Sequence, residues 1–346
     1  MLFWRWRDLR LYSHAAIGFA ALALVVVDAS VAGVRGNASS SPTPASSVAA
    51  HHQVLALGHG LHALAVASGG GRIWVLAQHG RHGSTAVAEI DPTTEQTVTS
   101  IQVPGAASHL FYGVGQVWVT GGTQISDVDP HGGHVRTIQL SGGTVSSMAF
   151  ERSTAYAAVI GRDELLAVTV GKQLRTRTIE EKGGPLTVVA VPRAIEVTND
   201  EMNLVPVIFP GADTSFLATL QLGRPVIASG GARVVWVRRR NLLVRETLRH
   251  GVSRPARQYL DVRGRPMQVT NTDDGGCYVT VSTARRSQPS LLYFSPQSLQ
   301  APHPKPTAVH RGRPVRSFAV DPAGGVAYVD VAGGLAKWVP SAKPLR

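Results

Sequence analysis

The sequence predicts an all-β fold built from about seven repeated four-stranded units, on three observations. Gly and Pro are frequent, at 36 and 21 of 346 residues, and charged residues make up only 16% of the chain. No stretch after residue 50 keeps the apolar period of 3.6 residues that an amphipathic helix needs. A strand with an aromatic residue recurs about every 40–50 residues, the period of blades with four strands each. We therefore expect a seven-bladed β-propeller.

The first 52 residues are expected to lie outside this domain. Residues 1–14 form a basic and aromatic tail, and residues 15–34 are apolar apart from Asp28. The apolar stretch is long enough to cross a bilayer as a helix, and the arginines that precede it place the N-terminus in the cytoplasm. Residues 35–52 form a linker rich in Ser, Pro and Ala, with too few large apolar side chains to fold.

This arrangement predicts a single-pass membrane protein whose propeller, residues 53–340, lies outside the cytoplasm. A cleaved signal peptide is the alternative, because small residues follow the apolar stretch near residues 29–33, and cleavage would give a secreted protein. Both interpretations place the propeller on the same side of the membrane.

The basic charge belongs to the predicted propeller. The net charge is +12, and the first 34 residues contribute only three arginines and two aspartates to it. Such a domain is expected to meet an anionic partner: a wall polymer, an anionic lipid head group or an acidic protein, with nucleic acid not favoured. Solubility alone is the alternative explanation. Cys277 is the only cysteine, so no intramolecular disulfide can form, and we expect a monomer held together by its core.

The aromatic strands mark the second strand, b, of each blade, which carries strands a to d in chain order. Both faces of such a strand are buried between neighbouring blades, so its aromatic side chains are expected to pack there. The clearest examples are Ile73–Val75, Val117–Val119, Ala155–Ala157, Val235–Val237, Cys277–Val279 and Ala327–Val329, with a fainter one at Ile195–Val197.

Turn residues recur with the same period. Glycines such as Gly69–Gly71 precede strand b and supply the positive φ that tight hairpins require. Asp91-Pro92 and Asp129-Pro130 follow the third strand, where Pro fixes φ and Asp caps the turn. Each unit therefore reads as four antiparallel strands joined by short turns.

The two ends of the domain predict ring closure. Residues 315–320, 326–330 and 335–339 read as strands a, b and c of a last blade without a fourth strand. Residues 53–57 form a spare strand before the first blade and can supply the missing one, which removes an open sheet edge. The alternative is an open two-sheet sandwich.

Several segments resemble a known repeat style. Residues 71–75 (GRIWV), 84–103 (STAVAEIDPTTEQTVTSIQV) and 115–120 (GQVWVT) are similar to YVTN-type and streptogramin-lyase-like seven-bladed propellers. The resemblance is good over residues 69–140 and partial to about residue 168. It implies blades, and the lyase-like members further imply catalytic His and Glu side chains with a divalent metal. No residue of this chain aligns with those side chains one by one, so the resemblance assigns no catalytic residue.

Arginines recur on one predicted face. In a propeller, the d–a and b–c loops share one face, here called the top face, and the a–b and c–d turns share the bottom face. The tripeptide Gly-Arg-Pro opens three consecutive a strands, and guanidinium groups suit carboxylate and phosphate ligands. We expect an anion-binding site on the top face, against the alternative of a repeated, solvated turn. Its candidate residues are Arg224, Arg265 and Arg313 at the tripeptides and Arg238, Arg240 and Arg285 in b–c loops.

Histidines gather in the first two blades, on loops predicted for the top face. They are candidate ligands of a divalent metal: His59, His62, His79, His82 and His109. No nucleophile elbow, phosphate loop or dinucleotide fingerprint is present. The sequence therefore favours a non-catalytic binding or scaffold module without a cofactor. The alternative is a streptogramin-lyase-like, metal-dependent enzyme.

Overall fold

The structure is a computed structural model that describes most of residues 51–340. Residues 58–59, 81–82, 163, 172, 181–184, 192–193, 200–204, 209–214, 219–225, 230–233, 240–241, 248–255, 283–287 and 322–324 lie outside the description. The predicted tail and membrane segment, and nearly all of the predicted linker, also lie outside it. Within the described ranges, no helix is both long enough and apolar enough to cross a membrane.

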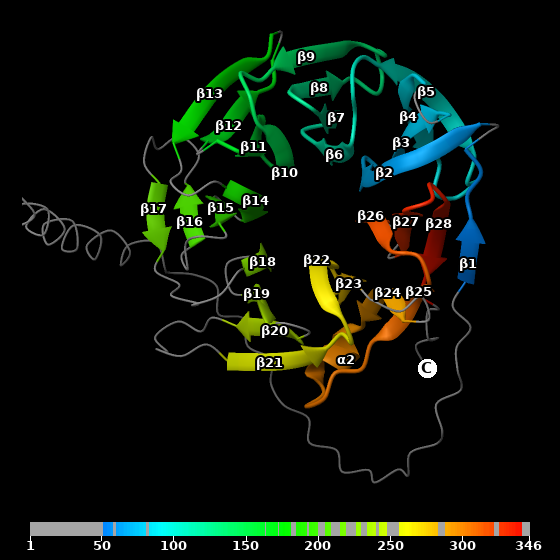
Figure 1. The fold of residues 1–346 in the computed structure, drawn as a ribbon, viewed down its shortest axis with the longest axis vertical. Coiled ribbons are helices and arrows are strands. Elements are labelled where there is room, and N and C mark those ends of the chain that lie inside the picture. The colour runs from blue at the N-terminus through cyan, green and yellow to red at the C-terminus, as the bar shows by residue number, and fades with distance from the viewer. Residues whose placement is uncertain are drawn as a thin grey trace, which may run out of the picture. The chain divides into compact units, whose positions relative to one another are not determined.

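The strands form seven four-stranded sheets arranged in a ring, which confirms the predicted seven-bladed propeller (Figure 1). In every sheet, neighbouring strands are antiparallel, and except in the last sheet they follow one another directly in the chain. The first strand of each sheet, strand a, lines the centre of the ring. These inner strands are β2 (Leu61–Gly69), β6 (His109–Gly113), β10 (Thr144–Glu151), β14 (Pro185–Val191), β18 (Val226–Ser229), β22 (Arg265–Asn271) and β26 (Val315–Val320).

The remaining strands follow outward in the order expected. The b strands are β3 (Arg72–His79), β7 (Gln116–Gly121), β11 (Thr154–Ile160), β15 (Ala194–Asn199), β19 (Val234–Arg239), β23 (Cys277–Ser282) and β27 (Val326–Asp330). The c strands are β4 (Thr85–Ile90), β8 (Gln124–Val128), β12 (Glu164–Thr169), β16 (Val205–Ile208), β20 (Leu242–Thr247), β24 (Pro289–Phe294) and β28 (Leu335–Val339). The d strands are β5 (Thr97–Val103), β9 (Val135–Gln139), β13 (Arg175–Glu180), β17 (Ser215–Ala218), β21 (Ala256–Asp261), β25 (Thr307–Arg311) and β1 (His51–Val54). A short helix, α2 (Pro296–Gln300), joins β24 to β25.

The ring closes by pairing of the first and last strands. β1 is the outer strand of the seventh sheet and pairs antiparallel with β28, from His51 opposite Val339 to Val54 opposite Ala336. The backbone N–H of Leu55 extends this ladder by donating to the carbonyl of Leu335 at 3.0 Å. Closure is confirmed, although the strand begins and ends earlier than the predicted residues 53–57.

The aromatic residues of the b strands fill the space between blades, as predicted. Trp118 and Tyr278 are fully buried. The indole N–H groups of Trp74 and Trp118 donate to the carbonyls of Gly69 and Gly113, each at 3.1 Å. This repeated hydrogen bond fixes each indole against the hairpin that precedes it.

The next blade contributes an aromatic side chain to each of these clusters. Tyr112 on β6 stacks on Trp74, with ring centroids 6.1 Å apart, and Phe150 on β10 lies 6.0 Å from Trp118. A Cβ at Gly69 would lie 1.9 Å from Cδ1 of Tyr112, so no other residue fits that position without a shift. This glycine is therefore set by packing between blades as well as by its turn.

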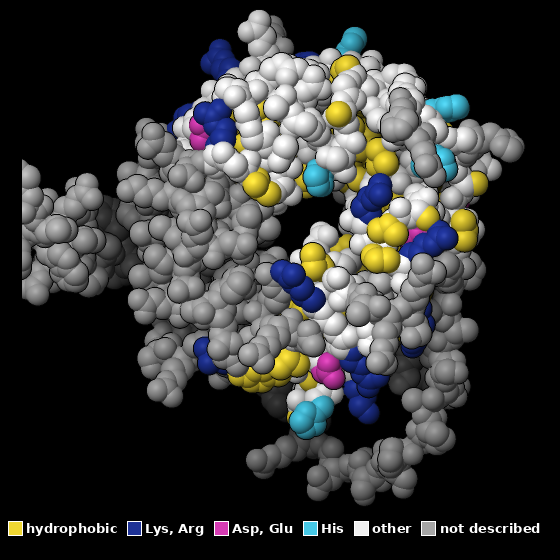
Figure 2. Space-filling view, viewed as in Figure 1, with side chains coloured by type: hydrophobic (Ala, Val, Ile, Leu, Met, Phe, Trp, Pro, Cys, Tyr) yellow, Lys and Arg dark blue, Asp and Glu magenta, His cyan; other side chains and the backbone are white. Residues whose placement is uncertain are grey.

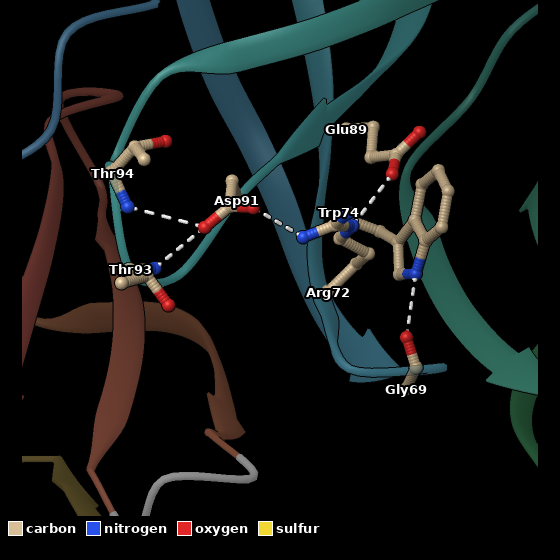
Figure 3. A network of polar contacts seen from close by, with 7 residues as sticks. All are labelled: Gly69, Arg72, Trp74, Glu89, Asp91, Thr93 and Thr94. Atoms are coloured by element: carbon tan, nitrogen blue, oxygen red, sulfur yellow. Dashed lines mark hydrogen bonds and ion pairs between the residues drawn. The ribbon is translucent and has the colours of Figure 1, made fainter.

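The predicted Asp turns lie on the bottom face. In the first blade, Arg72 binds Glu89 at 3.0 Å and also Asp91 (Figure 3). Asp91 accepts hydrogen bonds from the backbone N–H groups of Thr94 at 3.1 Å and Thr93 at 2.8 Å. These two bonds, with help from Arg72, hold the pKa of Asp91 below its ordinary value. The aspartate therefore caps the turn and anchors the start of β3.

Two further ion pairs on the bottom face join neighbouring blades. Arg136 binds the buried Asp127 in the second blade and donates to the carbonyl of Gly171 in the third at 2.6 Å. In the seventh blade, Lys337 lies 2.9 Å from Asp321 and donates to the carbonyl of Pro92 in the first at 2.7 Å. Burial raises the pKa of Asp127, while Arg136 opposes that rise.

Candidate binding face and central channel

A channel of about 890 Å³ runs through the centre of the ring. Figure 2 shows its mouth as a hollow, with Lys, Arg and His side chains at the rim. The a strands all run in the same direction, so their first residues meet at the top face and their last residues at the bottom face. The described lining comes from β2, β6, β10, β22, β23 and β26.

Irregularities in the inner strands decide which side chains enter the channel. In β2, β10, β22 and β26 the pairing with strand b skips one residue, as in a β-bulge. The skipped residues all line the channel: Leu64, Ser146, Met267 and Arg316. A bulge releases its residue from the alternation of the strand and can aim its side chain away from the two packed faces.

The two ends of the channel differ in chemistry. Ser108, His109 and Arg316 lie towards the top, where Leu64 and Met267 occupy the same bulge position as Arg316 in their own strands, whereas the aromatic Tyr112 and Phe150 lie towards the bottom. Arg316 is the one charged side chain among the described lining residues, taking histidine as neutral. Its guanidinium makes a long hydrogen bond of 3.4 Å to the carbonyl of Val331. The sequence analysis did not single out Arg316, because a lone arginine inside a strand carries no signal of a bulge.

Of the candidate metal ligands that the structure describes, only His109 lines the channel. A hydrogen bond of 2.8 Å joins its Nδ1 to the hydroxyl of Ser108, and its ring stacks on Phe111 with centroids 6.4 Å apart. Partial burial lowers the pKa of His109, which favours its neutral imidazole. A neutral imidazole can either donate or accept one further hydrogen bond at Nε2.

Of the other candidate histidines, His62 near the start of β2 and His79 at the end of β3 are exposed on the top face. His59 and His82 lie outside the described residues. Among the residues that are described, no group of three or more His, Cys, Asp or Glu side chains is placed to hold a metal ion. The described residues therefore do not fit the metal site that the lyase-like resemblance implies, and we derive no reaction step through a metal.

The two described tripeptide arginines lie on the top face, as predicted, but not at equivalent positions. Arg265 is the first residue of β22, and Arg313 precedes β26 by two residues. When the two strands are aligned at their bulges, Pro266 matches Val315, so Arg265 matches Pro314 rather than Arg313. The same tripeptide therefore places Arg265 and Arg313 at different positions relative to their inner strands.

The other predicted anion ligands are not described in full. Arg224, Arg240 and Arg285 lie outside the described residues. Arg238 belongs to β19, where its backbone lies opposite Leu243, and its side chain is outside the description.

Two arginines that were not predicted lie beside the predicted pair. The four, called the junction arginines, lie at the d–a junctions from β21 to β22 and from β25 to β26 and consist of Arg263, Arg265, Arg311 and Arg313. All four are exposed, and no ion pair joins them to another described residue. In the third blade, by contrast, the top-face Arg162 pairs with Glu164 at 2.6 Å.

Large apolar side chains are exposed on the same face. Ile160 ends strand b of the third blade, Leu242 begins strand c of the fifth, and Val331 follows strand b of the seventh. Their exposed fractions are 43%, 37% and 45%, and that of Met267 at the channel is 50%. The top face therefore combines apolar and cationic groups.

Acidic residues surround a smaller pocket of about 430 Å³ at the bottom end of the channel. It is lined by Ser68, Gly69, Asn271, Thr272, Asp273, Asp274, Val320 and Asp321. Asp274 accepts a hydrogen bond from the backbone N–H of Gly276 at 3.1 Å, and so caps its turn. The sorting of Asp turns to the bottom face is confirmed here but is incomplete, because Asp330 ends β27 on the top face.

Comparison with known proteins supports the fold. No family model and no curated protein matches the sequence. The streptogramin B lyase structure has 13% sequence identity and a TM-score of 0.61, covering 84% of this chain and 97% of that one. The WD40 β-propeller domain of Doa1 has 11% identity and a TM-score of 0.62, covering 84% and 98%. A chain of the mitotic checkpoint complex has 10% identity and a TM-score of 0.63, covering 91% and 100%.

Proposed function

We propose that this chain is a non-catalytic binding module whose top face docks an acidic protein. The observation that carries the proposal is the set of junction arginines, which are exposed and have no ion pair to another described residue. A guanidinium group with no ion pair in the described part of the chain can bind a carboxylate without displacing a described partner.

The apolar residues on the same face favour a protein over a purely anionic ligand. Protein interfaces are enriched in Arg and have an apolar core. Val331, which is 45% exposed, lies in the seventh blade, and Arg311 and Arg313 lie just before the first strand of that blade. A wall polymer or a lipid head group would use only the charge. One similar propeller belongs to the mitotic checkpoint complex, so the fold takes part in a protein assembly there.

Binding of the full chain to poly-glutamate tests this proposal. We expect binding at low salt that weakens as salt rises, because exposed charges are screened. Replacing both Arg265 and Arg313 by Gln should weaken it about tenfold, as expected for lost charged hydrogen bonds. The matched control replaces Arg152 and Arg175, which are exposed and lie on the bottom face, by Gln and so changes the net charge equally.

The outcomes separate specific docking from general charge. Equal losses in the two double variants would show that only net charge matters, and would overturn the proposal. Tighter binding to a glycerol-phosphate polymer or to phosphatidylglycerol vesicles than to poly-glutamate would assign the face to that ligand class instead. If apolar side chains introduced along the poly-glutamate polymer increase its affinity for the chain, that result would support a protein partner.

We further propose that residues 15–34 anchor the propeller outside the cytoplasm, as their apolar length and the preceding arginines indicate. A reporter fused after Arg346 should then be active only outside the cytoplasm, and the chain should sediment with membranes. Mature protein that begins near residues 30–38 would instead support the cleaved signal peptide. Activity of the reporter in the cytoplasm would contradict both.

The proposal includes no metal cofactor. Metal analysis of the purified full chain is expected to find no stoichiometric divalent ion. A stoichiometric ion that is lost on changing His79 and His82 to Ala would favour the metal-dependent enzyme.

A further inference from the structure

We infer that the central channel is a separate binding site for a small amphipathic anion, with its acidic group at the top end beside Arg316 and its apolar body below. The channel volume of about 890 Å³ is in the range of pockets that hold small organic molecules. The inference rests on the one cationic side chain at the top end of the described lining and on the aromatic side chains below it.

The top end offers donors for an acidic group. Arg316 projects from the bulge of β26 and lines the channel, and its one hydrogen bond among the described residues is the long one to Val331. Ser282, at the end of β23, also lines the channel, whereas the hydroxyl of Ser146 already donates to the carbonyl of Ala158 at 3.3 Å. A hydroxyl group and a guanidinium together can satisfy several lone pairs of one carboxylate.

The lower end offers an apolar wall. Tyr112, Phe150 and Phe318 line the channel in the second, third and seventh blades. Tyr112 and Phe150 are held in place by their stacking against Trp74 and Trp118. A rigid aromatic wall suits the flat or branched apolar body of a ligand, because burial of that body removes apolar area from water.

The acidic pocket fixes the orientation of such a ligand. It contains Asp273 and Asp274, together with Asp321, which is paired with Lys337. It lies at the bottom ends of inner strands, where Ser68 and Val320 follow the channel residues Ala67 and Ala319. An anionic group at the bottom end would meet the like charges of Asp273 and Asp274, whereas at the top end it meets Arg316. The charge distribution therefore selects one direction of binding.

This site is distinct from the docking face. None of the junction arginines lines the channel, and Arg316 is not one of them. A small acid could bind in the channel whether or not a protein docks above it, so each site can be tested with variants that leave the other intact.

Isothermal titration calorimetry of the full chain with naphthoate, and separately with its neutral amide, tests the inference by measuring the affinity and stoichiometry of each probe. The two probes have nearly the same size and differ in charge. We expect one naphthoate per chain, bound about tenfold more tightly than the amide. Arg316→Gln should remove this preference and leave the affinity for the amide unchanged, whereas Arg316→Lys should keep most of it.

Two further variants locate the site and control for charge. Met267→Gln keeps the side-chain length but removes apolar surface from the channel, and it should weaken both probes to a similar extent. Arg175→Gln, on the outer strand β13, removes an equal charge and should change neither affinity. Three results would overturn the inference. These are equal affinity of the unmodified protein for the two probes, no binding of either probe, or a preference for naphthoate that survives Arg316→Gln. Loss of poly-glutamate binding on changing Arg265 and Arg313 concerns the docking face and would not change the expected binding of naphthoate in the channel.

Discussion

The two faces of the ring use their charges differently. On the bottom face, Asp127, Asp321 and Asp91 each have a cationic partner, and two of these pairs reach into the neighbouring blade. On the top face of the sixth and seventh blades, the junction arginines have no ion pair to another described residue. Charges of the first kind hold the fold together, and charges of the second kind are free to bind a partner. Changes to the two kinds should therefore separate stability from binding.

The largest loss of stability is expected on changing Lys337 to Met. The carboxylate of Asp321 is fully buried and the lysine side chain is only 8% exposed, so the change leaves a buried charge without this cation. Removing one partner of a buried ion pair costs about 3–5 kcal/mol. Thermal or urea unfolding should show this loss. A double variant with Asp321→Asn should be more stable than Lys337→Met alone, and a double variant that is less stable would contradict this role for the pair.

A smaller loss is expected on changing Arg136 to Gln. Its partner Asp127 is fully buried, but the arginine side chain is 34% exposed, so water can replace part of the interaction. We expect a cost of about 2 kcal/mol, between the values for exposed and buried pairs. Arg136→Lys should recover only part of it, because a lysine cannot bind both Asp127 and the carbonyl of Gly171 in the same way. Full recovery by Lys would show that charge alone is needed.

Lowering the pH should change the contributions of two bottom-face aspartates to stability in opposite directions. The pKa of Asp91 is lowered, so its stabilising contribution is present above its unfolded value of 3.8 and is lost as pH falls through the lower folded pKa. The pKa of Asp127 is raised, so its protonation in the folded state favours folding as pH falls towards 3.8.

Unfolding measured as a function of pH checks these signs. Asp91→Asn should reduce the loss of stability below pH 3.8, and Asp127→Asn should remove a gain just above it. The same pH profile for both variants would contradict the opposite signs.

The smallest effect on stability is expected on the top face. Replacing Arg265 and Arg313 by Gln should change the free energy of unfolding by about 0.5 kcal/mol or less, because both side chains are exposed and unpaired within the described structure. The same variant should lose binding to poly-glutamate. A large fall in its melting temperature would show that these arginines serve the fold, and the contrast between the faces would fail.

The fold could be predicted from the sequence because each blade repeats its own signals. An aromatic residue on strand b and glycines or Asp-Pro in the turns are local features, and the predicted ranges 315–320, 326–330 and 335–339 match β26, β27 and β28. Even the fainter strand near Ile195 is present as β15, and Ile195 is fully buried.

The candidate site could be predicted only in part because it depends on register. The sequence shows identical Gly-Arg-Pro tripeptides, but the strands place Arg265 and Arg313 one residue apart relative to their bulges. A bulge depends on pairing with the neighbouring strand and leaves no local mark in the sequence. For the same reason Arg316, which a bulge turns into the channel, was not among the predicted residues.

The closing strand β1 also determines on which face of the ring the two ends of the domain lie. His51 lies opposite Val339, and both belong to the bottom edge, where strand c ends and strand d begins. Both of these residues therefore lie on the face opposite the junction arginines. Immobilisation through either end of the domain, on a sensor surface or a bead, would thus start from the bottom edge and leave the arginines and the mouth of the channel turned towards the solution.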